Sequence, residues 1–145
     1  MSTVLVYSDD PAVREQVRIA VGRRPDPSLD AIDWLEANDG GALITRVDEG
    51  GVDVCVLDGE AAPEGGMGIS RQLKNEIADC PAILLLVMRR DDHWLARWSQ
   101  ADATVRMPID PVEITETLVG LLRSRTVSSA PLPAPAAGDE LARRH

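Results

Sequence analysis

The chain has 145 residues, which suits one domain with a tail, and its hydrophobic share of 44% and charged share of 27% are ordinary for a globular protein. The net charge of −9 repels phosphate backbones, which argues against binding to nucleic acid or to an anionic membrane surface. No apolar run approaches the roughly 18 residues of a membrane span and no basic leader opens the chain, so we expect a cytoplasmic protein without membrane insertion.

Short β-branched runs alternate along the chain with longer stretches of helical spacing. This alternation predicts an α/β domain, in which a parallel sheet is covered by helices on both faces. The predicted strands cover residues 4–7, 30–36, 52–57, 82–88 and 104–106. The predicted helices follow apolar stripes within 13–21, 43–47, 69–77, 94–98 and 114–122. The resulting order is (βα)5.

Two Asp-Pro pairs indicate where helices begin. Asp10-Pro11 and Asp110-Pro111 each fit an Asp N-cap with Pro at the first helical position. From residue 126 the composition shifts to Ser, Pro and Ala, which cannot bury enough apolar surface to order itself. We therefore expect a domain at 1–125 and a disordered tail at 126–145. Cys55 and Cys80 have no metal-ligand spacing and are expected to be free thiols.

Acidic residues follow two of the predicted strands. The first strand ends in Ser8-Asp9-Asp10, and the third is followed by Asp58-Gly59-Glu60. If these strands are neighbours, three carboxylates converge at the carboxyl end of the sheet, where open parallel sheets form their sites. A divalent cation such as Mg²⁺ would relieve their repulsion. The alternative is that Asp9 and Asp10 serve the start of a helix and that Asp58 is a turn residue.

These positions resemble the receiver domain of response regulators over residues 1 to about 125. The features that carry the resemblance are an acidic doublet after the first strand, an Asp after the third and a Pro after the fifth. The resemblance implies a flavodoxin-like, doubly wound sheet of strand order 2-1-3-4-5. It also implies that Asp58 is the phosphoacceptor, that Asp9, Asp10 and the Glu60 carbonyl join it in binding Mg²⁺, and that the Met107-Pro108 bond is cis.

Three positions depart from the family pattern. Leu86 stands where the family has a Ser or Thr, Met107 where it has a Lys, and Thr104 where it has a switch aromatic. A leucine cannot hydrogen-bond a phosphoryl group and a thioether cannot neutralise its charge. Lys74, the only lysine, belongs to the third predicted helix. We therefore expect that phosphorylation of Asp58 is uncoupled from the usual switch.

Two tryptophans, Trp94 and Trp98, are spaced i, i+4 and so share one face of the fourth predicted helix. This face either packs on the sheet as part of the core or binds a partner, because Trp is enriched at binding hot spots.

The sequence thus favours an atypical single-domain response regulator that is not an enzyme and acts by binding a protein, either a histidine kinase or a downstream target. It is expected to be a monomer or a weak homodimer, with weak Mg²⁺ binding. One alternative is a phosphorelay intermediate. Another is a small flavodoxin-like enzyme or cofactor-binding protein, although the Ser8-Asp9-Asp10-Pro11 loop lacks the glycines of a phosphate cradle.

Overall fold

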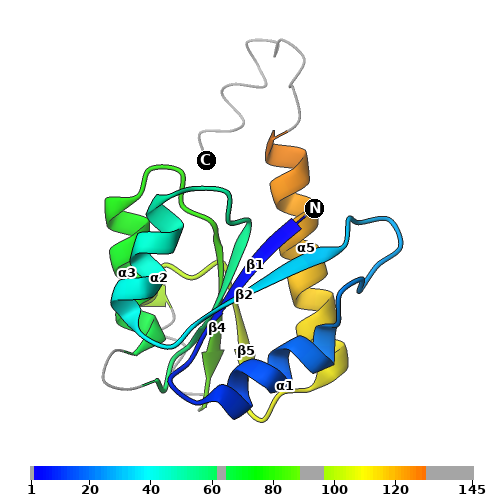
Figure 1. The fold of residues 1–145 in the computed structure, drawn as a ribbon, viewed down its shortest axis with the longest axis horizontal. Helices are drawn as coiled ribbons and strands as arrows, with labels where there is room; N and C mark the ends of the chain where they lie inside the picture. The colour runs from blue at the N-terminus through cyan, green and yellow to red at the C-terminus, as the bar shows by residue number, and fades with distance from the viewer. Residues whose placement is uncertain (1, 62–64, 89–96, 130–145) are drawn as a thin grey trace.

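The computed structural model describes residues 2–61, 65–88 and 97–129, with side chains as far as residue 125. At its centre lies a five-stranded parallel sheet of order β2-β1-β3-β4-β5 (Figure 1). The predicted flavodoxin-like fold is therefore confirmed. The strands are β1 (Ser2–Tyr7), β2 (Ile32–Ala37), β3 (Val54–Asp58), β4 (Ala82–Val87) and β5 (Ala103–Arg106). Each lies within two residues of its predicted bounds.

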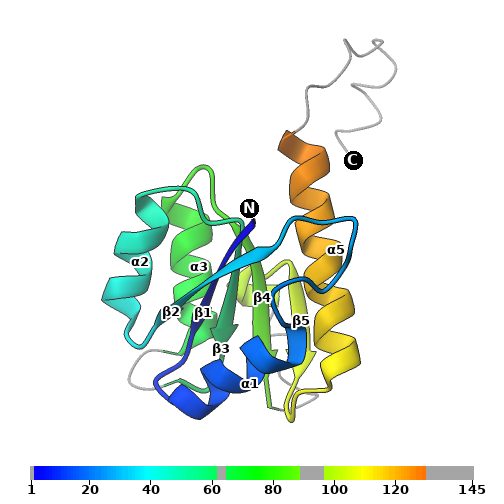
Figure 2. The same ribbon diagram turned by 45° about the vertical axis from the view of Figure 1, so that its right-hand side comes forward.

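Helices cover both faces of the sheet (Figures 1 and 2). One face carries α2 (Gly40–Asp48) and α3 (Gly66–Glu76), and the other carries α1 (Pro11–Val21) and α5 (Pro111–Ser129). Of the fourth predicted helix, residues 94–96 lie outside the described residues, while residues 97–99 are helical.

The helix starts follow from their Asp caps. Asp10 Oδ1 accepts a hydrogen bond from the Ala12 N–H at 2.9 Å, and Asp110 Oδ1 accepts one from the Val112 N–H at 2.9 Å. In both helices Pro occupies the first position, where its missing N–H would have no intrahelical partner. Both predicted caps are confirmed.

The core has two parts because strand residues point alternately to the two faces. In β1, Leu5 and Tyr7 pack with α2 and α3, whereas Val4 and Val6 pack with α1 and α5. All of β4 is buried, as expected for an apolar strand covered on both sides.

The last helix is longer than predicted. It continues to Ser129, so its final four residues fall in the segment expected to be a tail. Ser and Thr have only moderate helix propensity, but here they extend an established helix and need no new nucleus. Residues 130–145 lie outside the described part of the chain. Within the described part, no helix is long and apolar enough to cross a membrane.

Candidate functional site

A row of four residues crosses the sheet where the strands end, and its members are Ser8, Asp58, Leu86 and Val105. We call this side the carboxyl end of the sheet and the opposite side the amino end. The register pairs Asp58 with Leu86 and Leu86 with Val105, and it pairs Tyr7 with Leu57, so the next step places Ser8 beside Asp58. All four residues point to the face covered by α1 and α5, because they continue the alternation of that face.

Asp58 is buried, with 6% of its surface exposed, and protein groups bond both of its carboxylate oxygens. The Ser8 hydroxyl donates to Oδ2 at 2.8 Å, and the Glu60 backbone N–H donates to Oδ1 at 2.9 Å. The predicted position of Asp58 at the carboxyl end, next to β1, is therefore correct. A buried carboxylate needs such partners, since leaving it without them is costly.

Two glycines allow this close packing around Asp58. A Cβ on Gly66 would lie 2.7 Å from the Asp58 carbonyl oxygen, and one on Gly59 would lie 2.6 Å from the Leu86 carbonyl oxygen. Gly59 also donates its N–H to that Leu86 oxygen at 2.9 Å. The start of α3 and the end of β4 thus come closer to β3 than any residue with a side chain would permit.

The two acids after β1 lie at the surface. Asp9 and Asp10 are exposed, and Asp10 uses one carboxylate oxygen to cap α1. The Glu60 side chain is also exposed, and its backbone N–H donates to Asp58. Within the ranges that the structure describes, no three His, Cys, Asp or Glu residues are placed to hold a metal ion. Instead, each carboxylate oxygen of Asp58 is bonded by a donor of the protein itself.

Ser8, which was not predicted as a site residue, is fully buried and lies directly against Asp58. A signal for it was present in the strand alternation. Val4 and Val6 face the same side as Val54 and Val56, so Ser8 and Asp58 continue those two rows by one step. The prediction assigned the site to the charged Asp9 and Asp10 rather than to the neutral residue before them.

Of the three departures from the family pattern, Leu86 lies within this row, Thr104 lies on β5 and Met107 directly follows β5. Leu86 is fully buried and pairs with Asp58 in the register. Met107 packs partly buried against the same apolar cluster, and its bond to Pro108 is cis, as the resemblance implied. Thr104 is exposed on β5. None of these three side chains offers a cation, and Leu86 offers no hydrogen bond beside Asp58.

Lys74 is engaged at the amino end of the sheet. Its Nζ lies 2.7 Å from Asp102 Oδ2, an oxygen that also accepts the Ile83 N–H at 2.7 Å. Ile83 and Asp102 lie at the beginning of β4 and just before β5. The only lysine of the sequence is therefore committed to the end of the sheet that lies farthest from Asp58.

Trp98 is 44% exposed, so the interpretation that it belongs to the core is wrong. The guanidinium of Arg71 on α3 lies 4.7 Å from the centre of its ring and donates to the Trp98 carbonyl at 2.8 Å. The nearby segment is anchored instead by Ser70, whose buried hydroxyl donates to the Ser99 carbonyl at 2.9 Å. Trp94 lies outside the described residues.

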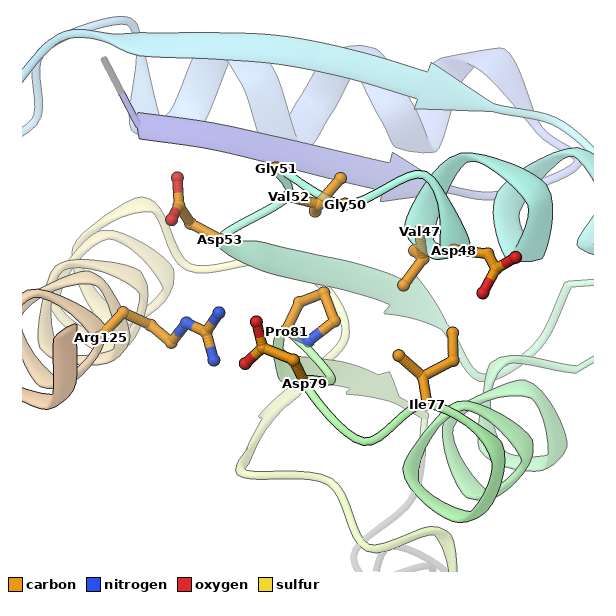
Figure 3. A pocket seen from close by; sticks show the side chains of 10 residues that line it. All are labelled: Val47, Asp48, Gly50, Gly51, Val52, Asp53, Ile77, Asp79, Pro81 and Arg125. Atoms are coloured by element: carbon orange, nitrogen blue, oxygen red, sulfur yellow. The ribbon is translucent and has the colours of Figure 1, made fainter.

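A cavity of about 310 Å³ opens at the amino end of the sheet (Figure 3). Arg125 of α5 and Asp79 point into it from opposite walls, and Gly50 and Gly51 form part of its rim. None of the predicted site residues lines it.

Cys55 and Cys80 in the nearby core are free thiols, as predicted. Burial raises the pKa of the Cys55 thiol to about 12 and also raises the pKa of the Cys80 thiol.

Known proteins give a consistent picture. Two proteins from two strains of Mycobacterium tuberculosis, both named uncharacterized response regulatory proteins, are 49% identical to this chain over 121 residues. The match covers 83% of this chain and 91% of each relative. The solved receiver domain of Francisella response regulator 1452 has a TM-score of 0.72 at 17% identity, covering 86% of this chain and 98% of that one. No protein-family model matches.

Proposed function

The chain belongs to the response regulator family, and from that premise we propose that it is a receiver-type binding module of two-component signalling in which Asp58 drives no phosphorylation switch. In this proposal the chain is not an enzyme. It acts by binding another protein, either a histidine kinase or a downstream target.

The observation that carries the proposal is Leu86 beside Asp58. A bound group shifts a conformational equilibrium only through contacts that differ between the two conformations. A phosphoryl group on Asp58 would meet an apolar, fully buried Leu86 where a hydroxyl could have moved toward it. Each hydrogen bond to a charged group contributes about 1.5–3 kcal/mol, so its loss removes a tenfold bias or more.

The position of the cations supports the same conclusion. Met107 brings a thioether to this side of the sheet, and Lys74 is paired with Asp102 at the other end. Arg106, next to Met107, is exposed on the opposite face of β5, as the alternation of a strand requires. A phosphorylated Asp58 would therefore lack the pairing ammonium that holds the signalling conformation.

The exposed Trp98 supports action through a partner. A large aromatic ring that is 44% exposed and held in place by Arg71 loses little freedom when a partner covers it. Trp and Arg are also the residue types most enriched at binding hot spots. We propose that Trp98 contributes to the partner surface, which is one of the two alternatives that the sequence left open for Trp94 and Trp98.

The experiment is a quantitative affinity capture with the full chain, its Asp58→Asn variant and its Trp98→Ala variant. The proposal expects the same partner with the wild type and Asp58→Asn, and loss of that partner with Trp98→Ala. Val112→Ala, which truncates another exposed apolar side chain, is the matched control and should capture normally. Capture that depends on Asp58, or on prior treatment with a phosphodonor, would contradict the proposal.

A phosphorelay intermediate is the second candidate, because Asp58 lies at the carboxyl end of the sheet, where the resemblance to receiver domains implies a phosphoacceptor. The intact mass of the wild type after incubation with acetyl phosphate distinguishes the two. A stable or transferable phosphoryl group on Asp58, absent in Asp58→Asn, would favour the relay.

A further inference from the structure

One hydroxyl connects three elements at the carboxyl end of the sheet. Ser8 Oγ donates to Asp58 Oδ2 at 2.8 Å and accepts from the Asp10 backbone N–H at 3.0 Å. A serine hydroxyl has a single hydrogen to donate, so that hydrogen is committed to Asp58. Ser8 therefore ties the end of β1 and the start of α1 to the end of β3, and its side chain is fully buried.

The Ser8 hydroxyl supplies what a cation would otherwise supply to Asp58. A buried carboxylate can be compensated by a positive ion or by hydrogen-bond donors. Here Asp58 receives one donor on each oxygen, from Ser8 and from the Glu60 N–H. This arrangement balances the carboxylate with groups of the protein itself.

A carboxylate in place of Ser8 would change the electrostatics of this position. Its oxygens would lie within a few ångströms of those of Asp58, and two like charges at such a distance repel each other. A divalent cation between them is the usual relief. A hydroxyl removes this repulsion and also removes one of the oxygen ligands that Mg²⁺ would use.

We propose that the Ser8 hydroxyl stands in for a divalent cation at Asp58 and that this one residue prevents the site from binding Mg²⁺. The proposal rests on the proposed function only in taking Asp58 as the centre of the receiver site. The neighbouring acids differ from Ser8 in position, because Asp9 and Asp10 are exposed and Asp10 uses one carboxylate oxygen to cap α1.

The test is a titration with Mg²⁺ alone of the full-length wild type, Ser8→Asp and Ser8→Asn. Amide-resolved spectra recorded at each Mg²⁺ concentration are the readout. Ser8→Asn is the neutral control, because asparagine has nearly the size of aspartate but no charge. The wild type and Ser8→Asn should show no saturating change at Asp58 and Glu60. Ser8→Asp should saturate with an affinity that is higher by roughly tenfold or more, because it adds a carboxylate ligand. Adding Asp58→Asn to Ser8→Asp should abolish this binding.

Two results would overturn the proposal: saturating binding of Mg²⁺ at Asp58 in the wild type, or no gain in affinity in Ser8→Asp. If Ser8→Asp does not fold, thermal melts decide instead. The wild type and Asp58→Asn should then respond equally to Mg²⁺, and a rise in melting temperature seen only in the wild type would refute the role of Ser8. Neither measurement involves a partner, so this proposal can fail while the proposed function stands, and the reverse also holds.

Discussion

The two ends of the central sheet satisfy their carboxylates by different means. At the amino end, Asp102 is paired with the ammonium of Lys74 and accepts a backbone N–H through the same oxygen. At the carboxyl end, Asp58 accepts from a neutral hydroxyl and a neutral amide. The single lysine of the sequence thus serves the end at which this fold does not place its sites.

This difference shows that the position of a charge matters more than its presence. An acidic residue at the carboxyl end of a parallel sheet marks a site of phosphate or metal chemistry only if cations can gather there. Among the described residues, Asp58 accepts from a neutral hydroxyl and a neutral amide, and its register partner on β4 is the apolar Leu86. We therefore expect the carboxyl end to be tightly packed and insensitive to ions, and the amino end to be tolerant and sensitive to salt.

The largest expected effect tests the tight packing at Asp58. Gly66→Ala would place a Cβ 2.7 Å from the Asp58 carbonyl oxygen, so backbone must move, and overpacking of this kind costs about 1–3 kcal/mol or more. Gly68→Ala, two residues along α3, has open space around its Cβ and should stabilise the protein by up to about 1 kcal/mol. Denaturant unfolding of both variants measures the contrast. Equal effects at the two positions would mean that the carboxyl end is loosely packed.

Removing the Ser8 hydroxyl tests the neutral donors at the same end. Ser8→Ala deprives Asp58 Oδ2 of its donor and the Asp10 N–H of its acceptor. We expect the free energy of unfolding to fall by about 2 kcal/mol, the cost of losing a buried bond to a charged group. In Asp58→Asn the same serine substitution should cost less, and a double-mutant cycle measures the difference. Additive effects would show that the two residues do not interact.

The ion pair at the amino end should contribute less. Lys74→Met removes a pair whose side chains are 19% and 38% exposed, and such pairs contribute about 0.2–1 kcal/mol. The loss should shrink further in high salt because salt screens exposed charges. Unfolding in low and high salt checks this prediction, and a salt-independent loss of several kcal/mol, on the scale of a buried pair, would contradict it.

The smallest effect is expected from the end of the chain. A version that stops after Ser129 retains the whole of α5 and should melt nearly unchanged, because a segment rich in Pro and Ala buries little apolar surface. A melting temperature several degrees lower, with 1 kcal/mol corresponding to about 2–8 °C for domains of this size, would show that residues 130–145 dock on the domain.

Most of the fold was predictable because its signals are local and repeated. Strand alternation and helical stripes gave the five strands and the described helices, and the Asp-Pro pairs gave two helix starts. The end of α5 was not predictable from composition, since polar residues such as Ser128 and Ser129 extend a helix that tertiary contacts have already formed.

The site was only partly predictable. The placement of Asp58 beside β1 followed from the sheet order, but Ser8 has no charge and drew no attention as a ligand or a catalyst. The exposure of Trp98 was not predictable either, because the i, i+4 spacing of two tryptophans shows that they share a helix face but not whether other residues cover that face. Its exposure depends on how Ser70 and Arg71 of α3 hold the neighbouring turn.

The most direct test of the central claim, that Asp58 drives no switch, is an amide-resolved spectrum of the wild type with Mg²⁺, recorded with and without beryllofluoride as a mimic of the phosphoryl group. A positive control carries Ser8→Asp, Leu86→Thr and Met107→Lys, which restore a cation ligand, a hydroxyl and an ammonium. We expect the control to respond as far as Thr104 and Trp98, and the wild type to remain unchanged at both residues. Changes in the wild type that spread to Thr104 and Trp98 would contradict the claim and show that another residue transmits the signal.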